Sequence, residues 1–256
     1  MKYLALCWIL VLMSSAVFAD VNGNRGEVRE RIEPKGYLYG FGLGLNQEIY
    51  AGYDYRVIPL PIIGYRGDNF RVLGPFVSYD AMEFSDIELT IQLAPRFQGF
   101  DESDSFIFEN MEERKFSMDA GLGLSYEKKD WKIGLSSMFD VLGRSKGYEA
   151  KANISRVFRK GPLFFEPSLS VSYLDSNHVD YYYGVKANET NEFTSEYLGQ
   201  SALNTTFSLS LATPVFLGGF TQVVVNYTWY DSAITKSPLV EDDSNISARF
   251  LFSKFF

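Results

Sequence analysis

The sequence has almost no cysteine, and beyond its first twenty residues it has no apolar run long enough for a membrane-spanning helix. Cys7 is the single cysteine among 256 residues, which excludes a disulfide framework. A transmembrane helix needs about 20 consecutive apolar residues, and no segment shows the apolar spacing of a convincing amphipathic helix. A helical membrane protein and a disulfide-stabilised secreted domain are therefore both excluded.

Positive charge and histidine are also scarce. The net charge is −8 and there is one histidine, His178. An acidic chain is a poor candidate for nucleic-acid binding. The residue two positions after His178 is Asp180 rather than a serine, and residues 101–104 offer only a loose acidic pair, so no catalytic set can be assembled. We interpret His178 as a turn histidine, and we expect no catalytic residue, no cofactor and no metal site.

The N-terminus has the three regions of a secretory signal peptide. Lys2 is followed by an apolar run, and small residues precede Asp20. We therefore expect residues 1–19 to be a cleaved signal peptide that takes Cys7 with it. Residues 20–36 should form a periplasmic N-terminal tail, and residues 37–256 a single barrel domain.

What the chain has in abundance is alternation of apolar and polar residues. In the stretch LNTTFSLSLA (203–212), large apolar side chains occupy almost every second position, which predicts a strand with one apolar face and one polar face. The same pattern recurs along most of the chain. The predicted strands are 37–46, 55–65, 69–79, 84–95, 115–126, 131–140, 147–158, 163–174, 179–187, 203–213, 220–230 and 245–256.

These strands favour an all-β fold, a transmembrane antiparallel β-barrel of about 12 strands. Most have the 9–11 residues that a tilted membrane strand needs, aromatic residues make up 16% of the chain, and the last strand ends on Phe256. A two-sheet sandwich would also alternate, but with shorter strands. Pro59 and Pro61 interrupt the second strand, and because proline cannot donate to a ladder we expect a distorted or interrupted wall there.

Charged residues of both signs fall at positions that the alternation assigns to the inner face. Charges in a narrow lumen must pair or be hydrated. They therefore predict either an ion-paired plug or a small water path, and the mixed signs favour the plug because they allow local pairing. The candidate lumen charges are Asp86, Glu88, Asp119, Lys132, Glu149, Lys151, Glu166 and Arg249.

The most charged link follows the fourth predicted strand. Counting strands from a periplasmic N-terminus places residues 98–114 in the periplasm, where barrel links are usually short. Either this link contacts periplasmic partners, or a hairpin is missing from the strand assignment. The candidate partner-docking residues are Asp101, Glu102, Asp104, Glu112 and Glu113.

From Gly64 onward six segments carry a resemblance to a known family: GYRGDNFRVLGPFVSYD (64–80), NMEERKFSMDAGLGLSYE (110–127), DVLGRSKGYEA (140–150), VDYYYGV (179–185), EYLGQSALN (196–204) and SPLVEDD (237–243). In this order and spacing they resemble the MltA-interacting protein/OmpV family of outer-membrane proteins. The resemblance implies a barrel in a Gram-negative outer membrane and supplies no catalytic residues. For some members it implies a scaffold that joins a murein lytic transglycosylase to a peptidoglycan synthase.

The resulting function hypothesis is a non-enzymatic scaffold for peptidoglycan-remodelling enzymes, embedded in outer-membrane lipid. A narrow porin-like channel for small solutes and a surface adhesin are the alternatives. Recovery of murein enzymes with the protein would favour the scaffold, whereas conductance in planar bilayers would favour the channel.

Overall fold

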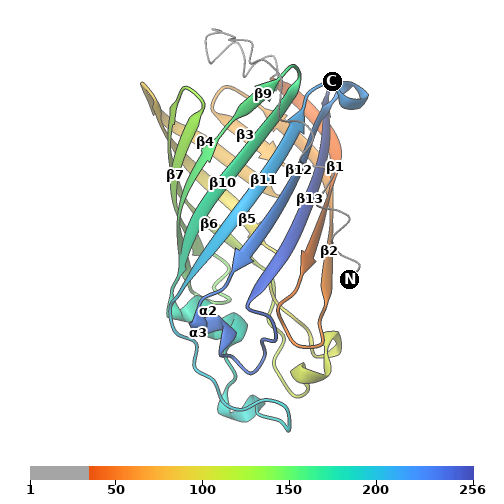
Figure 1. Cartoon of the computed structure of the whole chain (residues 1–256), viewed down its shortest axis with the longest axis vertical. Coiled ribbons are helices and arrows are strands. Elements are labelled where there is room, and N and C mark those ends of the chain that lie inside the picture. Colours follow the sequence, from red (N-terminus) through yellow and green to blue (C-terminus); the bar gives the residue numbers. More distant parts are fainter. Residues whose placement is uncertain (1–34) are drawn as a thin grey trace.

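The computed structural model describes residues 35–256, in which one antiparallel sheet closes into a barrel (Figure 1). The predicted signal peptide and most of the predicted tail lie outside the described residues. The sheet has thirteen strands. Two of them, β8 and β9, both pair with β10 and form one wall strand broken at Val157, so the wall has twelve, and the predicted fold is confirmed.

The strands occupy most of the described chain. Among the helical segments, none of those described is long and apolar enough to span a membrane. The strands are β1 (Gly36–Gln47), β2 (Tyr55–Arg66), β3 (Phe70–Leu73), β4 (Phe76–Phe84), β5 (Ile87–Arg96), β6 (Ser117–Lys128), β7 (Trp131–Asp140), β8 (Tyr148–Arg156), β9 (Phe158–Lys160), β10 (Leu163–Leu174), β11 (Ala202–Thr213), β12 (Phe220–Trp229) and β13 (Ser244–Phe255). The helices are α2 (Ser176–Tyr183) and α3 (Ser232–Thr235), with short 3₁₀ turns η1 (Glu102–Asp104), η2 (Phe106–Phe108), η3 (Ala187–Glu189) and η4 (Phe216–Gly218).

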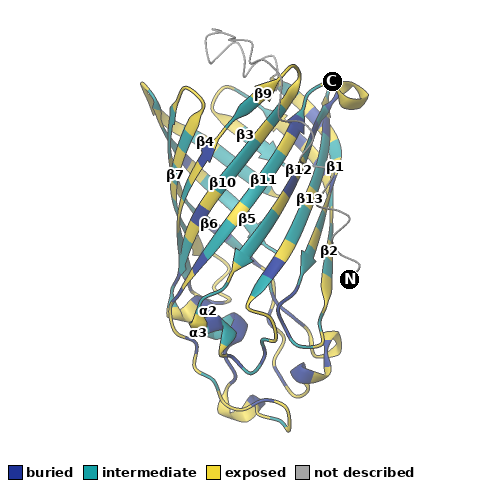
Figure 2. Cartoon of the chain, in the orientation of Figure 1, coloured by how far each residue is buried: buried dark blue, intermediate teal, exposed yellow. Residues whose placement is uncertain are grey.

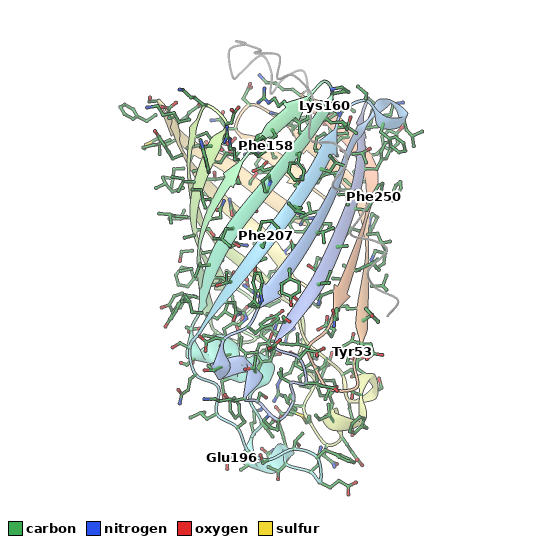
Figure 3. All side chains as sticks on the ribbon, viewed as in Figure 1. Tyr53, Phe158, Lys160, Glu196, Phe207 and Phe250 are labelled. Carbon is green, nitrogen blue, oxygen red and sulfur yellow. The ribbon has the colours of Figure 1, made fainter. Side chains whose placement is uncertain are left out.

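Closure comes from the pairing of the first strand with the last. β1 pairs antiparallel with β13 over nine residues, from Leu38 opposite Phe255 to Asn46 opposite Ser247. Closure removes sheet edges, which a hydrocarbon environment does not tolerate because an unpaired backbone group there costs several kcal/mol. Along the wall the large apolar side chains point outward, as Phe207 and Phe250 do, and they remain exposed or half-buried (Figures 2 and 3).

Two of the predicted strands are wrong, and their errors cancel in the count. The predicted strand 69–79 is a hairpin of β3 and β4, joined by Gly74 and Pro75. Gly74 has a φ of 58°, a left-handed value that suits glycine at the first position of a two-residue turn. The predicted strand 179–187 is instead helix α2, which begins after Asp175 and ends at Tyr183.

The missed hairpin moves the acidic link to the other end of the barrel. The short turns, the start of β1 and Phe256 lie at one end, which we call the turn end and which carries Lys160 in Figure 3. Five strands separate the start of β1 from residues 97–116, so this link lies at the opposite, lid end, with Tyr53 and Glu196. The strand count that put residues 98–114 at the same end as the start of β1 is therefore wrong, and the alternative of a missed hairpin is confirmed.

The expected interruption of the wall at Pro59 and Pro61 is present. β2 is twelve residues long, but β3 is only four and pairs with β2 at residues 64–66 alone. Residues 55–63 of β2 therefore have no β3 partner. The sheet register continues on the other side of this hairpin, where β4 pairs with β5 as far as Leu93.

The two faces of the wall predict opposite tolerance to charge. Leu209 on β11 belongs to the outward set, whereas Ser208 lines a cavity inside the barrel. Leu209→Arg should lower the free energy of unfolding in lipid vesicles by about 2–4 kcal/mol, the cost of arginine at the bilayer midplane. Ser208→Arg should cost much less, and denaturant titration of the two variants measures both. Equal losses would contradict the facing assignment.

Candidate functional site

Four segments fold over one end of the barrel and form a compact lid, residues 48–54, 97–116, 175–201 and 230–243. They contribute most of the buried hydrophobic residues of the described chain. The lid core consists of Ile49, Tyr50, Phe100, Ile107, Phe108, Met111, Leu174, Val179, Tyr182, Tyr183, Val185, Ala202, Ile234 and Leu239.

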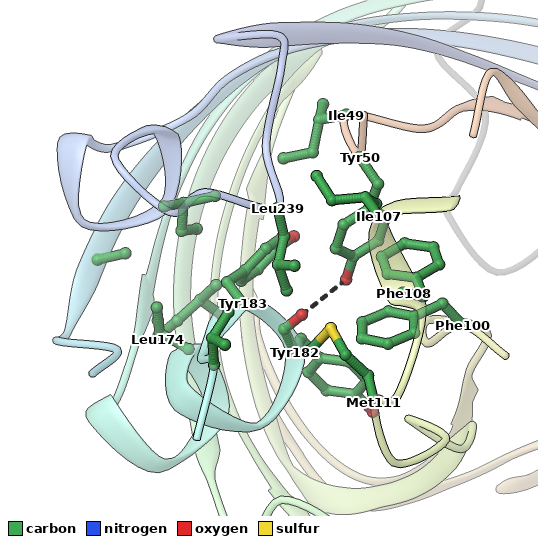
Figure 4. Packing of buried hydrophobic residues seen from close by; sticks show 14 residues of the cluster. Ile49, Tyr50, Phe100, Ile107, Phe108, Met111, Leu174, Tyr182, Tyr183 and Leu239 are labelled. Carbon is green, nitrogen blue, oxygen red and sulfur yellow. Dashed lines mark hydrogen bonds between the residues drawn. The ribbon is translucent and has the colours of Figure 1, made fainter. Parts of the chain in front are cut away.

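Aromatic stacking organises this core around Tyr50 (Figure 4). The Tyr50 ring lies edge-on to Phe100 and Phe108, which stack with centroids 3.8 Å apart, and it stacks on Tyr183. Its hydroxyl donates to the carbonyl of Tyr182 at 3.0 Å. Because burial raises the pKa of Tyr50 well above its ordinary value, the phenol stays protonated and remains a donor.

A buried ion pair joins two lid segments. Arg114 donates from both terminal nitrogens to the carboxylate of Glu189, at 2.9 and 2.6 Å, and the side chains are 3% and 0% exposed. Burial tends to raise the pKa of Glu189, but hydrogen bonds from Arg114 and from the amide of Lys186 bring it below its ordinary value. The pair therefore locks the long link 97–116 to the segment that follows α2.

Helix α2 carries the one histidine into the barrel mouth. Asp175 caps the helix, since its Oδ1 accepts from the amide of His178 at 3.0 Å and from that of Tyr148 at 3.0 Å. His178 is 2% exposed, and its Nε2 has no hydrogen-bond partner. Burial and the charge of Arg96 hold its pKa well below the ordinary value, so it is neutral. The interpretation of His178 as a turn histidine is wrong, because it lies in helix α2 and is buried.

The tyrosines after His178 serve the lid rather than the lipid boundary. Tyr182 and Tyr183 are buried in the lid core, and Gln98 donates to the Tyr183 hydroxyl at 2.8 Å.

Beneath the lid, one arginine joins two of the candidate lumen charges. Arg96 at the end of β5 donates from Nε to Asp119 at 2.7 Å and from a terminal nitrogen to Glu149 at 2.8 Å. The three groups come from β5, β6 and β8, so the pairing ties the inner face of the wall together. Arg96 was not among the predicted residues. Its alternation with the outward residues could have revealed it, because Arg96 is separated from the inward residue Glu88 by an even number of positions on the same strand.

The other candidate charges are distributed along the lumen. Lys132 lies 3.4 Å from Glu166, which also accepts from Ser155 at 2.6 Å. Glu88 lies 3.5 Å from Arg71, a second arginine that the sequence reading missed and that pairs with Asp80 at 2.7 Å. Asp86 is placed in the β4–β5 turn, at the rim of the barrel. Lys151 and Arg249 line a lumen cavity.

Cavities occupy the lumen between the lid and the turn end. One of about 450 Å³ lies directly under the lid and is lined by His178, Arg96 and Arg249. A second of about 470 Å³ shares Arg249 with it, and a third of about 380 Å³ lies nearer the turn end. Their volumes fall in the usual range of about 300–1,000 Å³ for ligand sites.

The candidate docking residues are all in the lid. Asp101 accepts from the backbone amide of Ser103 at 3.0 Å and caps η1, and Glu102 accepts from the amide of Asn110 at 3.0 Å. Asp104 accepts from the amide of Asp101 at 2.8 Å. Glu112 pairs with Lys186, and Glu113 lies 3.3 Å from Lys115. These carboxylates organise the lid locally.

A closed barrel with alternating faces, an apolar outer wall and long loops at one end defines a class, the membrane-spanning β-barrels. The chain belongs to the family described as MltA-interacting protein MipA, whose model matches residues 39–256. It is thus an outer-membrane β-barrel of that family, and the resemblance noted in the sequence is confirmed.

Individual relatives are distant but cover most of the chain. The protein of Escherichia coli (strain K12) named "Putative outer membrane protein YiaT" is 26% identical over 81% of this chain and 86% of its own length. The MltA-interacting protein of the same strain is 27% identical, with 80% and 84% covered. OmpV of Vibrio cholerae is 23% identical, with 70% of each covered. Among solved structures, a bacterial polysaccharide outer membrane secretin covers 87% of this chain and 99% of its own at 10% identity, with a TM-score of 0.41.

The buried ion pair should control the stability of the lid. Arg114→Met leaves the buried carboxylate of Glu189 without its bidentate arginine partner, and removing one member of a buried ion pair costs about 3–5 kcal/mol. Hydrogen exchange should therefore speed up at the lid amides and stay unchanged in the barrel strands. The neighbouring Lys115→Met removes an exposed pair and should change nothing measurable. Unchanged lid exchange in Arg114→Met would contradict this assignment.

Low pH should also destabilise the lid of the unmodified protein and speed up its hydrogen exchange. Because the folded-state pKa of Glu189 lies below its unfolded value, its contribution is present above the unfolded pKa and disappears as pH falls through the folded pKa. Glu189→Gln should lose this part of the acid sensitivity of the lid.

Proposed function

We propose that this protein is a non-enzymatic scaffold in the outer membrane that holds a murein lytic transglycosylase, and through it a peptidoglycan synthase, at its periplasmic end. The support is family membership together with a relative whose name states an interaction with MltA. The candidate charges of the lumen and lid serve the structure in this proposal and take no part in catalysis.

The architecture suggests which end faces the periplasm. Outer-membrane barrels have short periplasmic turns and longer external loops. By this rule the turn end is periplasmic and the lid is external, so the acidic link 97–116 cannot be the periplasmic docking surface. Docking has to use the turns.

One turn has the character of a docking site. The β11–β12 link exposes three consecutive apolar side chains, Val215, Phe216 and Leu217, the last of them 72% exposed. Leu217 also has a φ of 51°, which is uncommon for a residue other than glycine and carries a conformational cost. An exposed and strained apolar turn is the observation on which we base the location of the docking surface.

The two rival functions have less support. A channel would need a path through the lid, whose core packs across the barrel mouth. An adhesin would use the external face of the lid, where Phe193 and Leu198 are exposed.

The orientation can be tested by cysteine labelling, because Cys7 is the one cysteine of the chain and can be replaced by serine. A membrane-impermeant maleimide added to intact cells should label Glu192→Cys in the lid and spare Asp130→Cys in the β6–β7 turn. Both should react after the outer membrane is permeabilised. Labelling of Asp130→Cys alone in intact cells would reverse the orientation.

The docking surface can be tested by pull-down of a purified murein lytic transglycosylase with the detergent-solubilised protein. The double variant Phe216→Ser/Leu217→Ser should reduce recovery of the enzyme at least fivefold, because it removes the apolar contact. The matched variant Phe193→Ser/Leu198→Ser, at the lid end, should leave recovery unchanged. Heat-modifiable migration on gels shows that each variant is folded.

The outcomes separate the hypotheses. No recovery with the unmodified protein would overturn the scaffold proposal. Loss of recovery only in the lid variant would move docking to the external face and overturn the location proposed here.

A further inference from the structure

The interrupted wall beside β2 has the form of a framed opening, which we call the window. One side is β2 at residues 55–63, which lack a β3 partner, and the other is β5 at residues 94–96, which lie beyond the last β4 pairing. The β3–β4 turn at Gly74 and Pro75 closes the turn-end side. On the lid side, Arg56 bonds to Glu48 at 2.7 Å and donates to the carbonyl of Gly99 across the opening.

The window lies at membrane depth. The outward residues of β2 run from Tyr55 through Val57, Pro59, Pro61 and Ile63 to Tyr65. Aromatic residues mark the two interfaces of a membrane barrel, and apolar residues mark the hydrocarbon between them. The unpaired part of β2 therefore faces lipid, where unpaired backbone donors are costly.

Prolines remove donors along this edge. The amide of Gly74 donates to the carbonyl of Ile63 at 3.1 Å, so the backbone groups of Ile63 point away from β1. Because this direction alternates along a strand, those of residues 59 and 61 point the same way, into the window. Both are proline and have no N–H to leave unpaired. Pro75 and Pro95 lie on the frame as well, so four of the nine prolines surround one opening.

The cavity under the lid lies behind the strands that border the window. The cavity of about 450 Å³ is lined on the window side by apolar residues from both borders, Ile58 and Leu60 of β2 and Phe97 after β5, with Phe76 at the turn. The inner faces of the two strands that frame the window therefore form one side of this cavity, and its opposite side is polar.

The inner end of this cavity presents polar groups without protein partners. Arg249 lines it, and among residues 35–256 its guanidinium has no ion pair or side-chain hydrogen bond. His178, which is almost fully buried, lines the same cavity with its Nε2 unbonded. An unpaired cation and a buried ring nitrogen at the end of an apolar passage suit an anionic head group attached to an acyl chain.

We propose that the window admits the acyl chain of a single-chain anionic amphiphile from the membrane into the cavity, where Arg249 binds its head group. A carboxylate and a phosphate monoester share the chemistry that Arg249 recognises. The site is separate from the docking turn, which lies at the other end of the barrel, so the two proposals stand independently.

The head-group assignment is tested by binding of radiolabelled oleate to the full chain in phosphatidylcholine nanodiscs, with empty nanodiscs as background. Arg249→Gln should weaken binding at least tenfold, whereas Arg159→Gln, at the exposed rim, should leave it unchanged. Unlabelled oleate or oleoyl lysophosphatidate should compete, and whichever competes better identifies the head group. Equal competition by methyl oleate, or equal binding by Arg249→Gln, would overturn the assignment.

The window itself is tested by labelling from the lipid phase, in a Cys7→Ser background. Leu60→Cys, inside the cavity beside the window, should react with pyrene maleimide dissolved in the bilayer at least tenfold faster than Ser210→Cys. Ser210 also faces the lumen, but β11 is paired on both sides. Oleate should slow the labelling of Leu60→Cys. Equal rates at the two positions would show that the wall is closed to lipid and overturn the proposal.

Discussion

Pairing of every backbone donor and acceptor within the wall is the constraint on which the rest of this structure depends. Hydrocarbon contains no water that could replace a missing hydrogen-bond partner. The first strand, β1, therefore pairs with the last strand, β13. Irregular backbone is then confined to the ends of the barrel, and it is there that the lid, the helices and the docking turn are found. The largest departure from this rule lies beside β2, and there Pro59 and Pro61 remove two of the donors.

Because the apolar faces of the strands point to lipid, the barrel has no hydrophobic core of its own at its centre. The lid supplies the one large core among the described residues, assembled from segments far apart in sequence. Arg114 and Glu189 fasten two of these segments with charges that would be costly if unpaired. Under the lid, Arg96 does the same for three strands. Ion pairs thus connect the strands of the lumen at its lid end, and cavities remain beside them.

The barrel and its two faces were readable from alternation alone, since a period of two is the direct consequence of strand geometry. The strand number agreed only because one missed hairpin and one false strand cancelled. The β3–β4 hairpin had a local signal, because Gly74 and Pro75 form a dipeptide that marks turns. It was missed because the apolar residues on both sides were assigned to one strand. The α2 segment was mistaken for a strand because three tyrosines in a row favour strands. Its helical signal was local, because Asp175 caps the helix through the amide of His178 three residues on. The burial of Val179 and Tyr182 in the lid core, which stabilises the helix, was not visible in the sequence. The Arg114–Glu189 pair spans 75 residues and had no local signature.

The prolines in the second strand predicted an irregular wall, and their effect on stability depends on whether a neighbouring strand is present. In a fully paired strand each proline would leave a partner carbonyl without its donor, which argues against a central position. Beside an absent strand the same substitution is favourable, because it deletes the group that lipid cannot satisfy. The backbone nitrogens of Pro59 and Pro61 point into the window, and Pro75 and Pro95 lie on its frame. Clustered prolines around a short hairpin therefore indicate an opening in a membrane barrel. The cavity behind this opening is where we propose that an acyl chain binds.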